Sequence, residues 1–228
     1  VAQGQKVLLV CNQVKRAQDL YNQVAKRYGD VPTMLIHSRF RRCDRSDLET
    51  TLTSEYNSMP GACIVVSTQV VEVSLDISFD AMITECAPID ALVQRFGRVN
   101  RKRTRQTIGH YKPVYVVAPP DDKDEALPYT LDVLQRTFDV LPDHGELMEE
   151  RQVQSMIDQV YDHLELEDID FSGVAYCDGH WRLKELWHRA KSALLEALDI
   201  NSAVCVTESD KQAYLDADST ARTKMEIP

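Results

Sequence analysis

The sequence of 228 residues lacks several motifs that would identify its chemistry directly. It contains no GxxxxGK[ST] segment, and none of its eight glycines is followed by lysine, which excludes a complete P-loop for nucleotide phosphates. The six cysteines form no CxxC pair, a pattern typical of reduced, buried thiols in a cytosolic protein. No apolar run approaches the roughly 18 residues that span a bilayer, and no signal-peptide pattern is present. We therefore expect a cytoplasmic protein without membrane contacts.

The chain has no overall excess of positive charge, since 26 Lys and Arg stand against 36 Asp and Glu for a net charge of −10, but the charges are unevenly distributed. Residues 1–119 carry 16 Lys and Arg against 11 Asp and Glu, a net charge of +5. Residues 120–228 carry 10 against 25, a net charge of −15. Local basic patches decide phosphate binding more than the global sum does. We predict two domains that differ in character, at 1–120 and 121–228.

Short apolar runs alternate with helical patterns in the first of these domains. Five runs have the length and composition of buried parallel strands: 7–10, 34–37, 62–67, 79–84 and 114–118. Between them apolar residues recur three and four apart, as in Ala17, Leu20 and Val24. This alternation predicts right-handed βαβ crossovers and an α/β fold, a mostly parallel sheet flanked by helices. Ligands of such sheets bind beyond the carboxyl ends of the strands.

The remainder of the chain, after Pro119 and Pro120, is acidic and helical in pattern. Apolar spacing typical of helices occurs at 129–141, 146–166 and 183–198. We therefore predict an acidic helical extension. The chain begins at Val1 without a methionine, and we expect it to be part of a longer protein.

Three arginines and a glutamine occur within eight residues in QRFGRVNR, residues 94–101. The spacing predicts that Arg98 and Arg101 share one helical face. Gly97 allows a neighbouring segment to approach closely, and Gln94 can both donate and accept hydrogen bonds. Such a set is suited to gripping a polyphosphate. The alternative is the charged, solvated face of an ordinary helix.

Four segments together point to a known family. In chain order they are VLLVCNQVKRAQDLY (7–21), LIHSRFRRCDRSDLE (35–49), VVSTQVVEVSLDISFD (65–80) and ALVQRFGRVNRKR (91–103). This series resembles motifs IV, IVa, V and VI in the second RecA-like domain of a superfamily 2 helicase. The stretches HSRF, STQVVEVSLDI and LVQRFGRVNR resemble more narrowly the Cas3 family, the helicase-nucleases of CRISPR interference. The resemblance covers roughly residues 5–120.

The resemblance implies an ATP site between two RecA-like domains, of which this chain contains the second. Arg98 and Arg101 match the arginine fingers that reach the γ-phosphate, and a guanidinium suits developing phosphoryl charge because it stays charged and offers a planar fork of donors. Gln94 matches the residue near the attacking water. Arg95 and Asp76 match further contacts near the nucleotide, although Asp76 could instead cap local backbone donors. ATP and Mg²⁺ would be held mainly by the first domain.

The resemblance also implies DNA contacts at the strand ends and several partners. Ser38, Arg39, Thr68 and Gln69 would donate to phosphates without distinguishing bases. Expected partners are single-stranded DNA, the first RecA-like domain, the HD nuclease domain of the same protein, and the CRISPR surveillance complex. No His-Asp dipeptide is present, so the nuclease centre is not encoded here. Asp124–Leu127 (DEAL) follows the arginine segment, which argues against a DExx metal box, and we predict no metal site.

We accordingly predict the second motor domain of an ATP-dependent DNA translocase or helicase, an ATP hydrolase that is inactive without its P-loop domain. Two alternatives stay open. One is another superfamily 2 helicase that acts on DNA or RNA. The other is a stand-alone RecA-like module whose acidic helices bind a protein partner.

Overall fold

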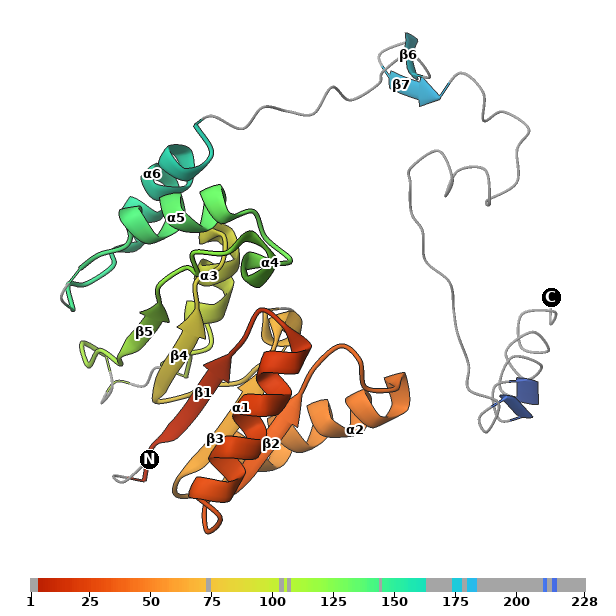
Figure 1. Ribbon diagram of the computed structural model, residues 1–228, viewed down its shortest axis with the longest axis vertical. Helices are drawn as coiled ribbons and strands as arrows, with labels where there is room; N and C mark the ends of the chain where they lie inside the picture. Colours follow the sequence, from red (N-terminus) through yellow and green to blue (C-terminus); the bar gives the residue numbers. More distant parts are fainter. Residues whose placement is uncertain are drawn as a thin grey trace. The chain divides into compact units, whose positions relative to one another are not determined.

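The computed structural model describes residues 4–72, 75–102, 105, 108–143, 145–162, 174–177, 180–183, 211–212 and 215–216. The chain divides into two units, residues 1–164 and 165–228. The first unit contains a sheet of five parallel strands in the spatial order β2-β3-β1-β4-β5 (Figure 1). The strands are β1 (Lys6–Val10), β2 (Thr33–Ile36), β3 (Cys63–Ser67), β4 (Ala81–Glu85) and β5 (Val114–Val117). The parallel α/β fold that the apolar runs predicted is confirmed.

Helices cover the two faces of the sheet. On one face, α1 (Val14–Arg27) packs Ala17 and Leu20 against Val7 of β1 and Ile64 of β3. The opposite face is covered by α2 (Arg42–Thr51), the π-helix η1 (Leu52–Tyr56) and α3 (Ile89–Phe96). With a layer on each side, β1 is buried along residues 7–10. This explains why its sequence is a continuous apolar run instead of an alternating one.

Three further helices lie beyond the carboxyl end of β4: α4 (Lys123–Ala126), α5 (Leu131–Val140) and α6 (Glu150–Val160). Ala126 and Leu134 pack on Cys86, which follows β4. Met156 and Val160 pack on Ile89 at the start of α3. The helices predicted at 129–141 and 146–166 are therefore present, although residues 163–166 lie outside the described residues. The predicted boundary at residue 120 stays a prediction.

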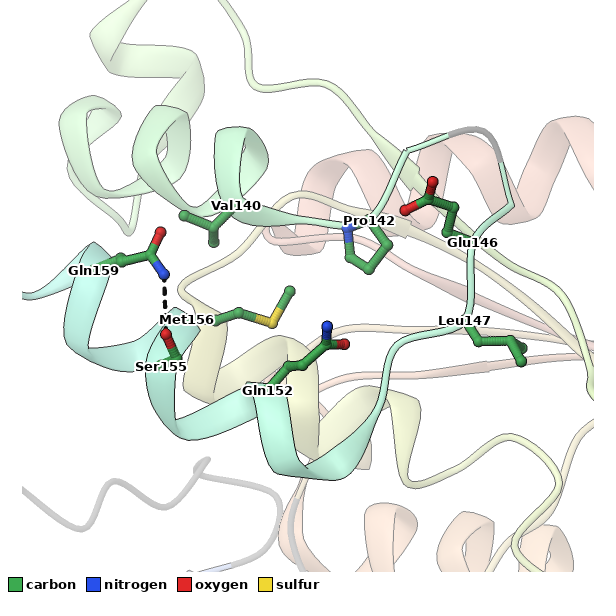
Figure 2. Close-up of a pocket in the computed structure, with 8 residues that line it drawn as sticks. All are labelled: Val140, Pro142, Glu146, Leu147, Gln152, Ser155, Met156 and Gln159. Carbon is green, nitrogen blue, oxygen red and sulfur yellow. Dashed lines mark hydrogen bonds between the residues drawn. The ribbon is translucent and has the colours of Figure 1, made fainter.

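A cleft of about 320 Å³ lies between the end of α5 and α6 (Figure 2). Met156 and Val140 point into it, and the bond from Gln159 to Ser155 lies along its rim. Its lining residues are Val140, Pro142, Glu146, Leu147, Gln152, Ser155, Met156 and Gln159. Because this lining contains no cation and none of the strand-end residues, the cleft is separate from the predicted phosphate site.

The described part of the second unit includes an antiparallel pair, β6 (Val174–Cys177) and β7 (His180–Leu183). This pair was not predicted. The intervening Asp178-Gly179 is a dipeptide favoured in two-residue hairpin loops, and it is the sequence signal that was missed. Leu183, assigned to a helix at 183–198, ends β7, and residues 184–198 lie outside the described residues.

Candidate functional site

Parallel strands bring the predicted DNA contacts to one edge of the sheet. Ser38 and Arg39 follow β2, while Thr68 and Gln69 follow the neighbouring β3. The register pairs Ile36 with Ser67, so the two segments leave the sheet at the same level. Ser38 and Arg39 are exposed. The structure thus brings these four residues together at the expected edge.

Two of the four are not free donors in this structure. Thr68 is only 1% exposed, and its Oγ1 atom has no hydrogen-bond partner within the described part of the chain. Gln69 donates from Nε2 to the backbone oxygen of Asn12 at 2.9 Å. The hydroxyl of Thr68 is therefore not presented to solvent in this structure, because the strand end is covered by the elements on both sides. Its contact with DNA stays a prediction.

His37 is also buried at this edge, at 4% exposure. Its ring stacks on Phe40 with 4.2 Å between centroids. Nδ1 has no partner among the described residues, and Nε2 lies 3.4 Å from Nε2 of Gln18. Burial lowers the pKa of His37 below its ordinary value, with a smaller effect in the same direction from Arg39. The neutral ring is therefore the form that suits the fold.

We expect the free energy of unfolding to fall as the pH decreases from about 7.5 to about 5.5, through the ordinary pKa of histidine. A lowered pKa in the folded state means that the unfolded chain binds the proton more tightly, so acid favours unfolding. His37→Phe retains a ring beside Phe40 but cannot take up a proton. Urea denaturation at both pH values should show a smaller loss for this variant, and an identical loss in both proteins would contradict the assignment.

Arg95, predicted to contact the nucleotide cleft, is completely buried. Nε donates to Glu72 Oε1 at 2.8 Å, and Nη1 donates to Thr84 Oγ1 at 2.8 Å. Nη2 donates to Asn12 Oδ1 at 3.0 Å. Burial raises the pKa of Glu72, although the Arg95 guanidinium pulls in the opposite direction. The side chain of Arg95 thus holds the carboxyl ends of three strands to α3.

Arg98 is likewise buried, at 5% exposure. Its three nitrogens donate to backbone oxygens of Val71, Leu75 and Glu72, at 2.7, 2.8 and 2.7 Å. Arg98 therefore does not point out of the domain in this structure, and its role as an arginine finger stays a prediction. The oxygens belong to the segment after β3, and the guanidinium satisfies them together.

Arg101 and Gln94 face outward. Gln94 is exposed on α3. The side chain of Arg101 is 44% exposed, and its Nε lies 3.1 Å from Oδ1 of Asp76, whose side chain is 72% exposed. Between them Asn100 adopts a positive φ of 52°, a conformation in which asparagine is enriched among non-glycine residues. Of the two predicted fingers, Arg101 is therefore the accessible one.

The helices after β5 are tied to α1 and α3 by polar side chains. Gln13 donates to the backbone oxygen of Leu127 at 3.1 Å, and Arg16 donates to the backbone oxygen of Glu125 in α4. Tyr161 donates to Asp90 of α3. The DEAL segment lies in and directly after α4, whose N-cap Asp122 accepts from the backbone nitrogens of Asp124 and Glu125.

Two absences concern the described ranges alone. They contain no group of three or more His, Cys, Asp or Glu side chains placed to hold a metal ion. None of their helices has the length and apolar character needed to cross a membrane. The contacts of Asn12, Thr84 and Glu85 join residues far apart in sequence and could not be predicted from local patterns.

Comparison with known proteins agrees with this arrangement. Residues 3–104 match the family described as CRISPR-associated nuclease/helicase Cas3, C-terminal. The CRISPR-associated nuclease/helicase Cas3 of Streptococcus thermophilus is 32% identical over 166 residues, which are 69% of this chain and 18% of that protein. The chain spans about a fifth of the length of the curated relatives that it matches.

Solved structures show the same similarity. The T. fusca Cas3-ATP structure superimposes with a TM-score of 0.62 at 28% identity, covering 72% of this chain and 21% of that one. A second similar chain comes from the structure named CRISPR RNA-guided surveillance complex, pre-nicking. The match has a TM-score of 0.54 at 25% identity and covers 73% of this protein and 22% of the other chain. Residues 3–104, with the parallel sheet and the four motifs in order, therefore belong to the family of Cas3 C-terminal domains, as a RecA-like helicase domain of superfamily 2.

Proposed function

We propose that this chain is the second motor domain of an ATP-dependent, single-stranded-DNA translocase or helicase of CRISPR interference. The observation that carries the proposal is the difference in burial among the three arginines of residues 94–101. Arg95 and Arg98 are buried and hold the segments around them, whereas Arg101 is exposed beside Asp76. A rigid support with one accessible guanidinium is what an arginine finger requires.

In this proposal Arg101 reaches the γ-phosphate of ATP held by a P-loop domain, and Gln94 lies near the attacking water. Arg98 could reach the nucleotide only by leaving its three backbone oxygens, so we assign it to positioning, together with Arg95. Asp76 orients Arg101. The P-loop domain would supply most contacts to ATP and Mg²⁺, and this chain alone would be inactive. The solved ATP complex of the T. fusca relative supports the choice of nucleotide.

The names of the relatives support the wider setting. They are called nuclease/helicases, and one similar chain belongs to a surveillance-complex structure. We propose the same partners here: the P-loop RecA-like domain, the HD nuclease domain and the surveillance complex. Single-stranded DNA would lie along the strand-end edge formed by Ser38, Arg39, Thr68 and Gln69, of which Ser38 and Arg39 are exposed.

We expect the 228-residue chain to bind oligo(dT) weakly, with an affinity that falls steeply between about 50 and about 200 mM salt, because phosphate contacts release counterions. Arg39→Ala should weaken binding and make the salt dependence shallower by the equivalent of about one phosphate. Fluorescence anisotropy of labelled oligonucleotides measures both quantities. Oligo(dA) should behave alike, since backbone contacts do not distinguish bases.

The matched control is Arg27→Ala. Arg27 is exposed at the last turn of α1, a helix that runs back across the sheet, so the residue lies toward the opposite edge. Its removal takes away the same charge and should leave affinity unchanged. Equal losses in both variants, or strong base preference, would count against the strand-end edge.

A further inference from the structure

Asn12, the second residue after β1, uses all four of its polar groups in bonds to other elements. Its backbone nitrogen donates to Glu85 Oε2 at 2.6 Å, and Nδ2 donates to the oxygen of Cys86 at 2.7 Å. Oδ1 accepts from Arg95 at 3.0 Å, and its backbone oxygen accepts from Gln69 at 2.9 Å. The residue is 8% exposed. Asparagine provides a donor and an acceptor on one short side chain, which this position requires.

These bonds close a ring around the 3₁₀ turn η2 (Gln69–Val71). Gln69, at the beginning of the turn, bonds to Asn12. Glu72, directly after the turn, bonds to the same arginine that Asn12 holds. Arg95 therefore cannot shift relative to η2 without losing a charge-assisted bond in a buried place, where such bonds are strong and costly to leave unmade.

We propose that Asn12 is a positioning residue that locks α3 and the arginine segment to the turn carrying the strand-end donors. The inference rests on the proposed function, because it concerns how DNA at Gln69 alters ATP turnover at Gln94 and Arg101. A displacement of η2 by DNA is passed to α3 through Arg95. Without the amide oxygen of Asn12, Arg95 keeps Glu72 and Thr84 but loses its link to the end of β1.

The test measures kcat and KM for ATP, with and without single-stranded DNA, in the assembly of this chain with its P-loop domain. Asn12→Ala removes both side-chain bonds, whereas Asn12→Asp keeps the acceptor for Arg95 and loses the donor to Cys86. Gln13→Ala is the control. The neighbouring Gln13 donates to backbone oxygens of α4, whereas the bonds to Arg95 and Gln69 are made by Asn12. Melting temperatures are recorded for every variant.

We expect Asn12→Ala to lower the DNA-stimulated kcat by about tenfold or more, with KM for ATP within about twofold, as the loss of a bond to a charged group predicts. Asn12→Asp should recover most of that kcat although its melting temperature is lowered, since the oxygen of Cys86 loses its donor. A merely structural role would make activity follow melting temperature in both variants.

Equal kcat in Asn12→Ala and Gln13→Ala, or a folded Asn12→Asp that is as deficient as Asn12→Ala, would overturn the inference and leave the proposed function standing. If Asn12→Ala does not fold, Asn12→Asp decides alone: a kcat within about threefold of the parent supports the inference, and a loss of about tenfold overturns it. Absence of DNA-stimulated turnover in the parent assembly would overturn the proposed function together with the inference.

Discussion

Replacing Arg98 with alanine is expected to destabilise the domain by about 3 kcal/mol or more, since each bond from a charged donor contributes roughly 1.5–3 kcal/mol and the three are not additive. Its guanidinium is the shared partner of three backbone oxygens. Removing the guanidinium leaves these three oxygens without their donor at a site where the Arg98 residue is only 5% exposed, and a buried acceptor without a donor is costly. For a chain of this length, the melting temperature should fall by roughly 6–12 °C.

Thermal and urea denaturation of the 228-residue chain measure this effect without reference to activity. Arg98→Lys should recover less than half of the loss, because one ammonium on a flexible stem cannot reproduce a planar fork. The control is Arg101→Ala, which removes the same side chain three residues further along, where it is 44% exposed. A melting temperature of Arg98→Ala within about 2 °C of the parent would show that the three bonds are unimportant.

Arg101→Ala should show the opposite pattern, with little change in stability and a fall in ATP turnover of about 10³-fold, the lower range for an arginine finger. Its side chain makes an exposed ion pair with Asp76, and such pairs contribute at most about 1 kcal/mol to folding. The rate loss arises because transition-state charge is left unstabilised. Arg101→Lys should not restore the rate.

The assay requires the P-loop domain and single-stranded DNA. Lys102→Ala is the matched control: it removes one exposed positive charge from the adjacent position, so a general loss of DNA affinity would appear in both variants. Turnover within about threefold of the parent in Arg101→Ala would remove Arg101 from the site. Robust turnover by the 228-residue chain alone would contradict the claim that it contributes only half of an active site.

The contrast between Arg98 and Arg101 shows that spacing in the sequence does not predict side-chain direction beyond the end of a helix. A spacing of three predicts a shared face only while the helix continues. Helix α3 ends at Phe96, and both Gly97 and Asn100 lie outside it. Arg98 therefore turns inward and Arg101 outward, although the spacing predicted one shared face for both. Helix ends are the least certain part of a sequence-based assignment.

The strands were predictable for a physical reason. A parallel strand with helices on both faces must be apolar throughout, and 7–10 and 62–67 carry that signal with little ambiguity. The ring of hydrogen bonds around Asn12 could not be predicted, because Arg95 lies 83 positions away in sequence and local periodicity carries no information about such a contact. Thr68 illustrates the same limit, since burial at a strand end depends on the neighbouring elements and not on the hydroxyl.

The position of β1 in the middle of the sheet governs how the domain can assemble. Val7 is paired on one side with Ile64 and on the other with Ala81. Both hydrogen-bonding edges of β1 therefore pair with strands that lie more than 50 residues later in the sequence. Local hairpins cannot start such a sheet. The centre of the sheet forms only when long chain loops close, and the entropy of those loops is lost before the strand contacts form. Such topologies fold slowly, and their strand edges stay exposed until folding is complete.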